Sequence, residues 1–258
     1  MRSRVLCVVV VLLVLAGILP TGIPPGTSGA EGRRFEIELE GGPIWQSRNE
    51  VQIPNTGEGT RFSAVDLIGK GPWPSVRLYL TYDLNPKHAL RLLLAPLAFT
   101  ETGILGSAVS FAGESYEPGV PTEATYKFNS WRATYRYRLW GSERWRLHIG
   151  FTAKIRDAKI ELGQEGRSSR KTDLGFVPLL HLAADCRLAQ HWHLRLDLDA
   201  LAGGPGRAED LGINLGYDLT ERWRISAGYR TVEGGADVEG VYNFAWLHYA
   251  AISALCGF

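Results

Sequence analysis

Apolar and polar residues alternate one by one over long stretches of this chain. Between 74 and 84 the apolar residues occupy every second position, and Arg77 and Asp83 are among the polar residues between them. The stretch 144–156 repeats the pattern, with apolar residues at every odd position from Trp145 to Ile155. Successive side chains of a β-strand point to opposite faces, so each stretch predicts a strand with one apolar and one polar face.

A short polar turn between two such stretches recurs four times. The four units are YDLNPKHALRL from Tyr82, YRLWGSERWRLHI from Tyr137, CRLAQHWHLRL from Cys186 and YDLTERWRISA from Tyr217. The segments between these units are longer and richer in Gly, Ser, Glu and Pro, and we expect loops at 46–72, 100–123, 157–172, 203–209 and 233–240. Short turns at one end and long loops at the other are typical of bacterial outer-membrane barrels.

The alternating stretches predict ten antiparallel strands, near 34–45, 74–84, 88–99, 126–139, 144–156, 173–188, 192–202, 210–219, 223–232 and 242–257. The predicted fold is therefore all-β, a transmembrane up-and-down β-barrel with both termini at the short-turn end. Pro43, Pro96 and Pro178 lie within or at the ends of these strands, where they imply bulges or strand ends. A water-soluble barrel of the lipocalin kind is the alternative, but it would leave rows of arginine outside.

Aromatic residues support burial in a membrane. One set lies beside the four short turns: Tyr82, Tyr137, Trp140, Trp145, Trp192, Tyr217 and Trp223. A second set lies near the expected loops: Trp45, Phe99, Phe176, Tyr229 and Trp246. Aromatic rings gather at both membrane–water interfaces, so we expect both sets to point outward as two belts.

The first 30 residues predict a signal peptide. Arg2 and Arg4 precede an apolar run from Val5 to Leu19, and Ser28-Gly29-Ala30 offers small residues for cleavage after Ala30. The run is shorter than the roughly 20 residues that a membrane-spanning helix needs. We therefore expect residues 1–30 to direct export and residues 31–258 to form the barrel, with an uncleaved anchor as the alternative.

Composition narrows the functional classes. The chain has 45% hydrophobic residues and a mean hydropathy of −0.08, and no second run approaches 18 apolar residues, which excludes a helical membrane protein. A net charge of +1 gives no reason to expect binding to nucleic acid. Cys7 would leave with the signal peptide, and Cys186 and Cys256 should lie too far apart around the wall to form a disulfide.

The chain ends in Ala254-Leu255-Cys256-Gly257-Phe258, an alternating strand closed by phenylalanine. This ending is similar to the C-terminal signature of Gram-negative outer-membrane β-barrel proteins. The resemblance identifies the superfamily and not the member. It implies passage through the periplasm, insertion by the barrel assembly machinery, and contact with outer-membrane lipids and lipopolysaccharide.

The turns fix which residues face each other inside the barrel. If Leu188 opposes Trp192, then Asp185 opposes Arg195 and His181 opposes Asp199, and by the same counting Asp218 opposes Arg224. We also expect a basic wall of Arg132, Arg136, Arg138 and Arg146 to face Glu36, Glu38 and Glu40 from roughly the opposite side. A ten-stranded barrel is narrow, so these charges should pair and fill much of the lumen.

His181, Asp197 and Asp199 are the candidate catalytic residues, because a histidine oriented by a carboxylate can act as a general base. The omptin proteases, which are ten-stranded outer-membrane barrels, use Asp–Asp and Asp–His pairs. The His-x-Ser tripeptide of lipid A deacylases is absent, and no cofactor or metal motif occurs. We therefore expect a structural or small-solute passage protein without catalysis, whose basic wall would favour anions if the lumen is open. An outer-membrane hydrolase and a loop-mediated adhesin or ligand-binding barrel are the alternatives.

Overall fold

The computed structural model describes residues 34–258, which form one compact unit. The predicted signal peptide lies outside the described residues. Among residues 34–258, no helix is long and apolar enough to cross a membrane.

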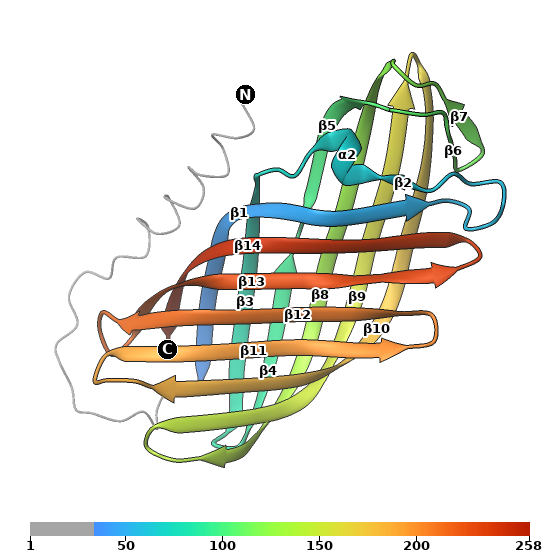
Figure 1. Cartoon of the computed structure of the whole chain (residues 1–258). Helices are drawn as coiled ribbons and strands as arrows, with labels where there is room; N and C mark the ends of the chain where they lie inside the picture. Colours follow the sequence, from blue (N-terminus) through green and yellow to red (C-terminus); the bar gives the residue numbers. More distant parts are fainter. Residues whose placement is uncertain (1–33) are drawn as a thin grey trace. The chain divides into compact units, whose positions relative to one another are not determined.

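In the described part of the chain, ten antiparallel strands close into a barrel (Figure 1), which confirms the predicted fold. Closure comes from the pairing of the last strand with the first, where Glu36 lies opposite Gly257. One of the ten strands is interrupted and consists of two short strands, His88–Ala95 and Ala98–Ile104, which both pair with the same neighbour. The interruption falls at Pro96, as the sequence predicts. The wall strands are β1 (Phe35–Gln52), β3 (Trp73–Asn85), β4 (His88–Ala95) with β5 (Ala98–Ile104), β8 (Pro121–Gly141), β9 (Trp145–Gln164), β10 (Arg167–Arg187), β11 (Trp192–Gly203), β12 (Gly206–Asp218), β13 (Trp223–Val238) and β14 (Val241–Gly257).

The four short turns occur where they are predicted, and side chains hold three of them. Asn85 accepts hydrogen bonds from the amides of Lys87 and His88. Ser142 accepts one from Trp145, and Thr220 accepts one from Trp223. Asn, Ser and Thr favour turns because their short side chains reach the backbone two or three residues on. The register follows from these turns: Asp185 pairs with Arg195, His181 with Asp199, and Asp218 with Arg224, as predicted.

The prediction of a loop is wrong for three of the five segments, because the strands continue through them. Residues 157–172 belong mainly to β9 and β10, while the segments 203–209 and 233–240 contain only tight turns between strands. The 20 residues of β9 span roughly 65 Å at about 3.3 Å per residue, far more than the apolar band of about 25 Å on an outer-membrane barrel. The sequence predicts strands that are too short, because polar residues point outward at the loop-side ends of the strands and resemble the residues of a loop.

True loops cover one part of the rim. The segment between β1 and β3 contains β2 (Phe62–Ser63) and the short helix α2 (Ala64–Ile68), and the segment between β5 and β8 contains the hairpin of β6 (Val109–Phe111) and β7 (Glu114–Tyr116). Helix α2 contacts β1 and β5, and thus covers the place where β3 and β5 do not pair. Trp73 and Phe99 stack there, with ring centroids 3.8 Å apart.

At a second break in the pairing, the β6–β7 hairpin contacts only the loop-side end of the unpaired strand, where Ser169 donates a hydrogen bond to the backbone of Phe111. Strand β10 pairs with β11 only from Leu180 to Arg187, so its loop-side half, residues 167–179, has β9 on one side and no strand on the other. Figure 1 shows β9 and β10 extending away from the turn between β11 and β12. Pro178 lies just beyond the last pair, and proline is found in strands where its nitrogen faces an unpaired edge. We call residues 167–179 the free edge of β10.

The outer surface carries a band of exposed apolar and aromatic side chains. Of the aromatic residues beside the short turns, Tyr82, Trp140, Trp145 and Trp192 belong to it, while Tyr137, Tyr217 and Trp223 are half-buried. Trp246 and Tyr229 near the loop end are also exposed. Phe176 is 65% exposed on β10, consistent with the second belt. Phe99 is a correction: it is only 5% exposed and stacks on Trp73, because every second residue from Arg91 through Ala95 to Phe99 faces the interior.

Phe99→Ala should therefore lower the free energy of unfolding by about 3–5 kcal/mol, as truncation of a buried phenylalanine does. Phe176→Ala is the matched control and should cost much less, because its ring lies on the outer surface. Urea titration of the barrel refolded in phosphatidylcholine liposomes, followed by tryptophan fluorescence, measures both. Equal losses would contradict the inward position of Phe99.

Candidate functional site

A network of buried ion pairs crosses the interior at mid-height, and Asp210 is its centre. Asp210 on β12 accepts hydrogen bonds from Arg230 (2.6 Å), Arg132 (2.6 Å) and Arg77 (2.8 Å). These arginines come from β13, β8 and β3, so one carboxylate joins distant parts of the wall. All four side chains are at least 95% buried. Each charge thus has direct partners, which a buried charge requires.

Two glutamates of β1 extend the network toward the short-turn end. Glu40 accepts hydrogen bonds from Arg230 (3.0 and 3.1 Å) and also lies 3.4 Å from Arg77. Glu38 accepts from Arg195 (2.6 Å) and from Ser253 (2.7 Å). Arg195 in turn reaches Asp185 at 3.4 Å. Glu38 and Glu40 are therefore paired with arginines of β3, β11 and β13.

The expected pairing of the glutamates of β1 with the basic wall is not observed. Only β3 and β4 separate β1 from β8, so the two sets do not face each other across the lumen. Arg132 instead binds Asp199 (2.8 Å) and Asp210. Arg136, Arg138 and Arg146, like Glu36, lie at inward positions of their strands nearer the short turns. Asp218 there accepts hydrogen bonds from Arg224 (2.6 Å) and lies 2.6 Å from His193 Nε2.

Of the three candidate catalytic residues, His181 and Asp199 join this network through Arg132, and Asp197 belongs to a separate buried ion pair. His181 Nδ1 is 2.8 Å from Asp199 Oδ1, an oxygen that also accepts a hydrogen bond from Thr152. Asp197 is bound instead to Arg91, by two hydrogen bonds of 2.6 and 3.0 Å. The His181 side chain is 0% exposed. A histidine–carboxylate pair exists, but neither solvent nor substrate reaches it in this conformation.

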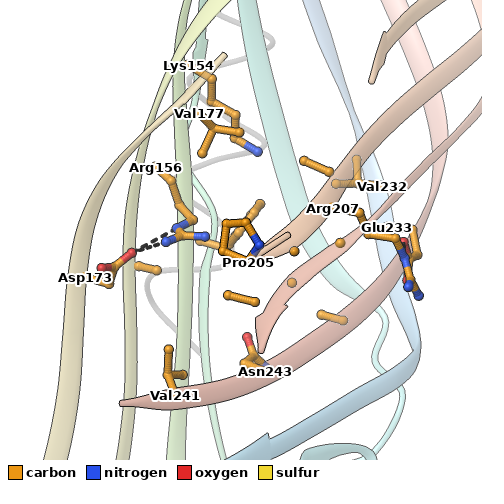
Figure 2. Close-up of a pocket in the computed structure, with 18 of the residues that line it drawn as sticks. Lys154, Arg156, Asp173, Val177, Pro205, Arg207, Val232, Glu233, Val241 and Asn243 are labelled. Atoms are coloured by element: carbon orange, nitrogen blue, oxygen red, sulfur yellow. Dashed lines mark hydrogen bonds and ion pairs between the residues drawn. The ribbon is translucent and has the colours of Figure 1, made fainter. Parts of the chain in front are cut away.

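Above the network, toward the loops, the interior becomes apolar and opens into a cavity of about 490 Å³. Pockets of about 300–1,000 Å³ hold small molecules. Its walls come from β8, β9, β10 and the β11–β14 hairpins, and the free edge of β10 forms one side (Figure 2). The apolar lining includes Ile53, Tyr126, Phe128, Ile160, Val177, Leu201, Val232, Val241, Ala245 and Leu247.

Two basic side chains of β9 reach this cavity. Arg156 is held by Asp173 of β10, with one hydrogen bond of 3.0 Å from Nε, and Figure 2 shows this pair at the cavity wall. Lys154 lies deeper, and its ammonium end points into the open space in Figure 2. Lys154 is only 3% exposed. Its one described attractive contact is a cation–π interaction, in which Nζ lies 4.8 Å from the centre of the Phe128 ring.

Sequence reasoning missed several residues of these buried ion pairs. Arg77, Arg91, Asp210 and Arg230 were not proposed for the lumen, although each occupies an inward position of an alternating strand. Every second residue of a strand shares a face, so the inward position predicted for Arg224 also predicts an inward position for Arg230, six residues further along the strand. Within residues 34–258, no cluster of three His, Cys, Asp or Glu side chains is placed to hold a metal ion. Cys186 and Cys256 do not form a disulfide, as the sequence predicts.

Asp210→Asn should lower the free energy of unfolding by about 3–5 kcal/mol, because it leaves three buried guanidinium groups short of a carboxylate. Glu233→Gln is the matched control: Glu233 binds Arg207 through two hydrogen bonds of 2.7 Å, but this pair is exposed and should change stability little. Urea titration in liposomes compares the two. If Asp210→Asn is as mild as the control, the network does not hold the barrel together.

No protein-family model matches the sequence, and no curated protein matches it. Solved structures do resemble it. The outer membrane protease OmpT from Escherichia coli superposes with a TM-score of 0.57 at 10% identity, covering 90% of this chain and 99% of that one. The attachment invasion locus protein Ail of Yersinia pestis gives 0.36 at 12% identity, covering 87% and 99%. The toluene transporter TodX of Pseudomonas putida gives 0.36 at 9% identity, covering 87% and 90%.

At these identities the likeness concerns the fold, and only the first superposition is close enough to support an argument. That superposition extends over 90% of this chain, so the likeness includes the closed wall. The chain has the fold of the outer-membrane β-barrel proteins.

Proposed function

We propose that this protein is an integral outer-membrane barrel that is closed at rest and binds a small solute of apolar character in its loop-side cavity. The observation that carries the proposal is the apolar cavity of about 490 Å³ directly above a continuous network of buried ion pairs. The cavity provides a place to bind. The network supports a closed lumen, so passage to the other side would require its ion pairs to separate.

The exposed apolar band supports the membrane setting. Exposed leucine, isoleucine, phenylalanine and tryptophan side chains surround the wall from β3 to β14, a surface that water would penalise and lipid would cover. In this setting the band would contact outer-membrane lipids and lipopolysaccharide. The terminal Phe258 would be read by the barrel assembly machinery during export through the periplasm.

The hydrolase alternative has less support. A general base must come within hydrogen-bond reach of the proton that it removes, and His181 is enclosed on every side by Asp199 and its neighbours. The contact between His181 and Asp199 instead satisfies a buried carboxylate. This pair therefore supports a structural role in the network.

A neutral dye that fluoresces in apolar surroundings, N-phenyl-1-naphthylamine, tests the cavity. The barrel refolded in phosphatidylcholine liposomes should bind the dye above the level of empty liposomes. Ala158→Trp, which fills the lining of the cavity, should abolish this extra signal. Ala153→Trp on the outward face of the same strand is the control and should leave the signal intact. Dye binding that survives Ala158→Trp would overturn the proposed site.

Single-channel recording in planar bilayers tests the closed lumen. The unaltered protein should give no steady current, because the ion-pair network fills the lumen at mid-height. The double variant Arg132→Ala/Arg230→Ala removes two bulky members of the network and should raise the frequency of open events. Heat-modifiable gel migration confirms that each sample is folded. A steady current through the unaltered barrel would show that the network leaves a pore.

A further inference from the structure

We infer that Lys154 is the anion-binding group of the cavity, and that the natural occupant is an apolar molecule carrying a carboxylate. The inference rests on the proposed function, because it names the chemical class of the solute that the cavity holds. It depends on the surroundings of one side chain and on the shape of the cavity.

Lys154 is a buried cation without a counter-ion among the described residues. Other lysines of the same region are paired: Lys127 lies 2.7 Å from Asp157, and Lys159 lies 2.6 Å from Glu161. Lys154 is more buried than either, yet its only described favourable partner is the face of Phe128. Leaving a buried ammonium unpaired is costly. An anion in the adjoining cavity would remove that cost.

The neighbours of Lys154 add to the need for an anion. On β8 its direct cross-strand neighbour is Arg132, and like charges in this arrangement repel. The carboxylates that bind Arg132, Asp199 and Asp210, are already engaged by Arg132 and other donors. Arg156, two residues along β9, is bound to Asp173. The acids near Lys154 are therefore occupied, and its charge remains for a ligand.

The rest of the cavity fits an apolar body. Aromatic and aliphatic side chains line it, and Asn243, which is labelled in Figure 2, is already bound to Asn49 and to the backbone of Glu50. At the rim of the lining, Arg156 is paired with Asp173 and Arg207 with Glu233, and Lys171 adds a further positive charge. A cationic group at the floor and apolar walls above it match an anionic head on an apolar body. A sugar or a peptide would bring many polar groups that these walls cannot pair.

The free edge of β10 gives this molecule a way in. Leu174, Phe176 and Pro178 lie on its outward face, and Leu174 is 76% exposed. Val177 and Asp173 lie on its inward face and line the cavity. With no strand paired to this edge, the cavity wall and the outer apolar surface meet there. An apolar carboxylate could pass from the outer leaflet to Lys154 without crossing the loops.

Competition with the neutral dye tests the inference. Decanoate and decanol each displace N-phenyl-1-naphthylamine from the barrel in phosphatidylcholine liposomes, and the ratio of their competition constants is measured. Lys154→Met should weaken decanoate about tenfold or more, as loss of a charge-assisted hydrogen bond does, and should leave decanol within about twofold. Lys154→Arg should retain decanoate. Lys87→Met, at the short turn between β3 and β4 and outside the cavity lining, should change neither.

The outcomes separate the two proposals. If the dye fails to bind, or if Ala158→Trp does not block it, the proposed function is wrong. If the dye binds as expected but decanoate is insensitive to Lys154→Met, only the carboxylate site is wrong. The titration is repeated in liposomes that contain phosphatidylglycerol. Loss of Lys154-dependent competition there would identify a lipid phosphate as the occupant and overturn the assignment to a free carboxylate.

Discussion

The constraint that organises this barrel is that each strand must direct its apolar face away from water, and the side on which water lies changes along the strand. On β9 the apolar residues point outward from Trp145 to Ile155, whereas Ala158, Ile160 and Leu162 point inward. Asp157 and Lys159 are then outside. The same reversal occurs on β8, between Trp131 outside and Tyr126 inside. A strand that leaves lipid for water must exchange its faces in this way.

This reversal divides the interior into two chemically different halves. Where lipid surrounds the wall, the interior holds the polar side chains, and the ion pairs around Asp210 satisfy them at the cost of filling the lumen. Where water surrounds the wall, the interior is apolar and packs with α2 and the β6–β7 hairpin. The cavity lies at the boundary, so it combines apolar walls with a cationic floor. Its amphipathic character follows from the same constraint.

The sequence is sufficient to predict what depends on local periodicity. Strand number, the four short turns, and the pairs Asp185–Arg195 and His181–Asp199 all follow from alternation and turn chemistry. The sequence is insufficient where the apolar residues of a strand move from its outward face to its inward face. For this reason its pattern predicts a loop at 157–172, where the structure has strands. Partners across the lumen, such as Arg132 with Asp210, depend on barrel closure and tilt, which no local pattern contains. The cavity also depends on the point at which the pairing between β10 and β11 ends. In the sequence, only Pro178 indicates that point.

The network and the cavity are not independent parts, because Lys154 at the floor of the cavity is the direct cross-strand neighbour of Arg132 in the network. Arg132 binds Asp199 and Asp210 below, and it lies beside Lys154 above. Charges a few ångströms apart in a partly buried setting interact by several kcal/mol at an effective dielectric of about 20. An anion at Lys154 would therefore weaken the repulsion on Arg132 and change the balance of the ion pairs that close the lumen. Occupancy of the cavity and closure of the barrel are linked through this one guanidinium group.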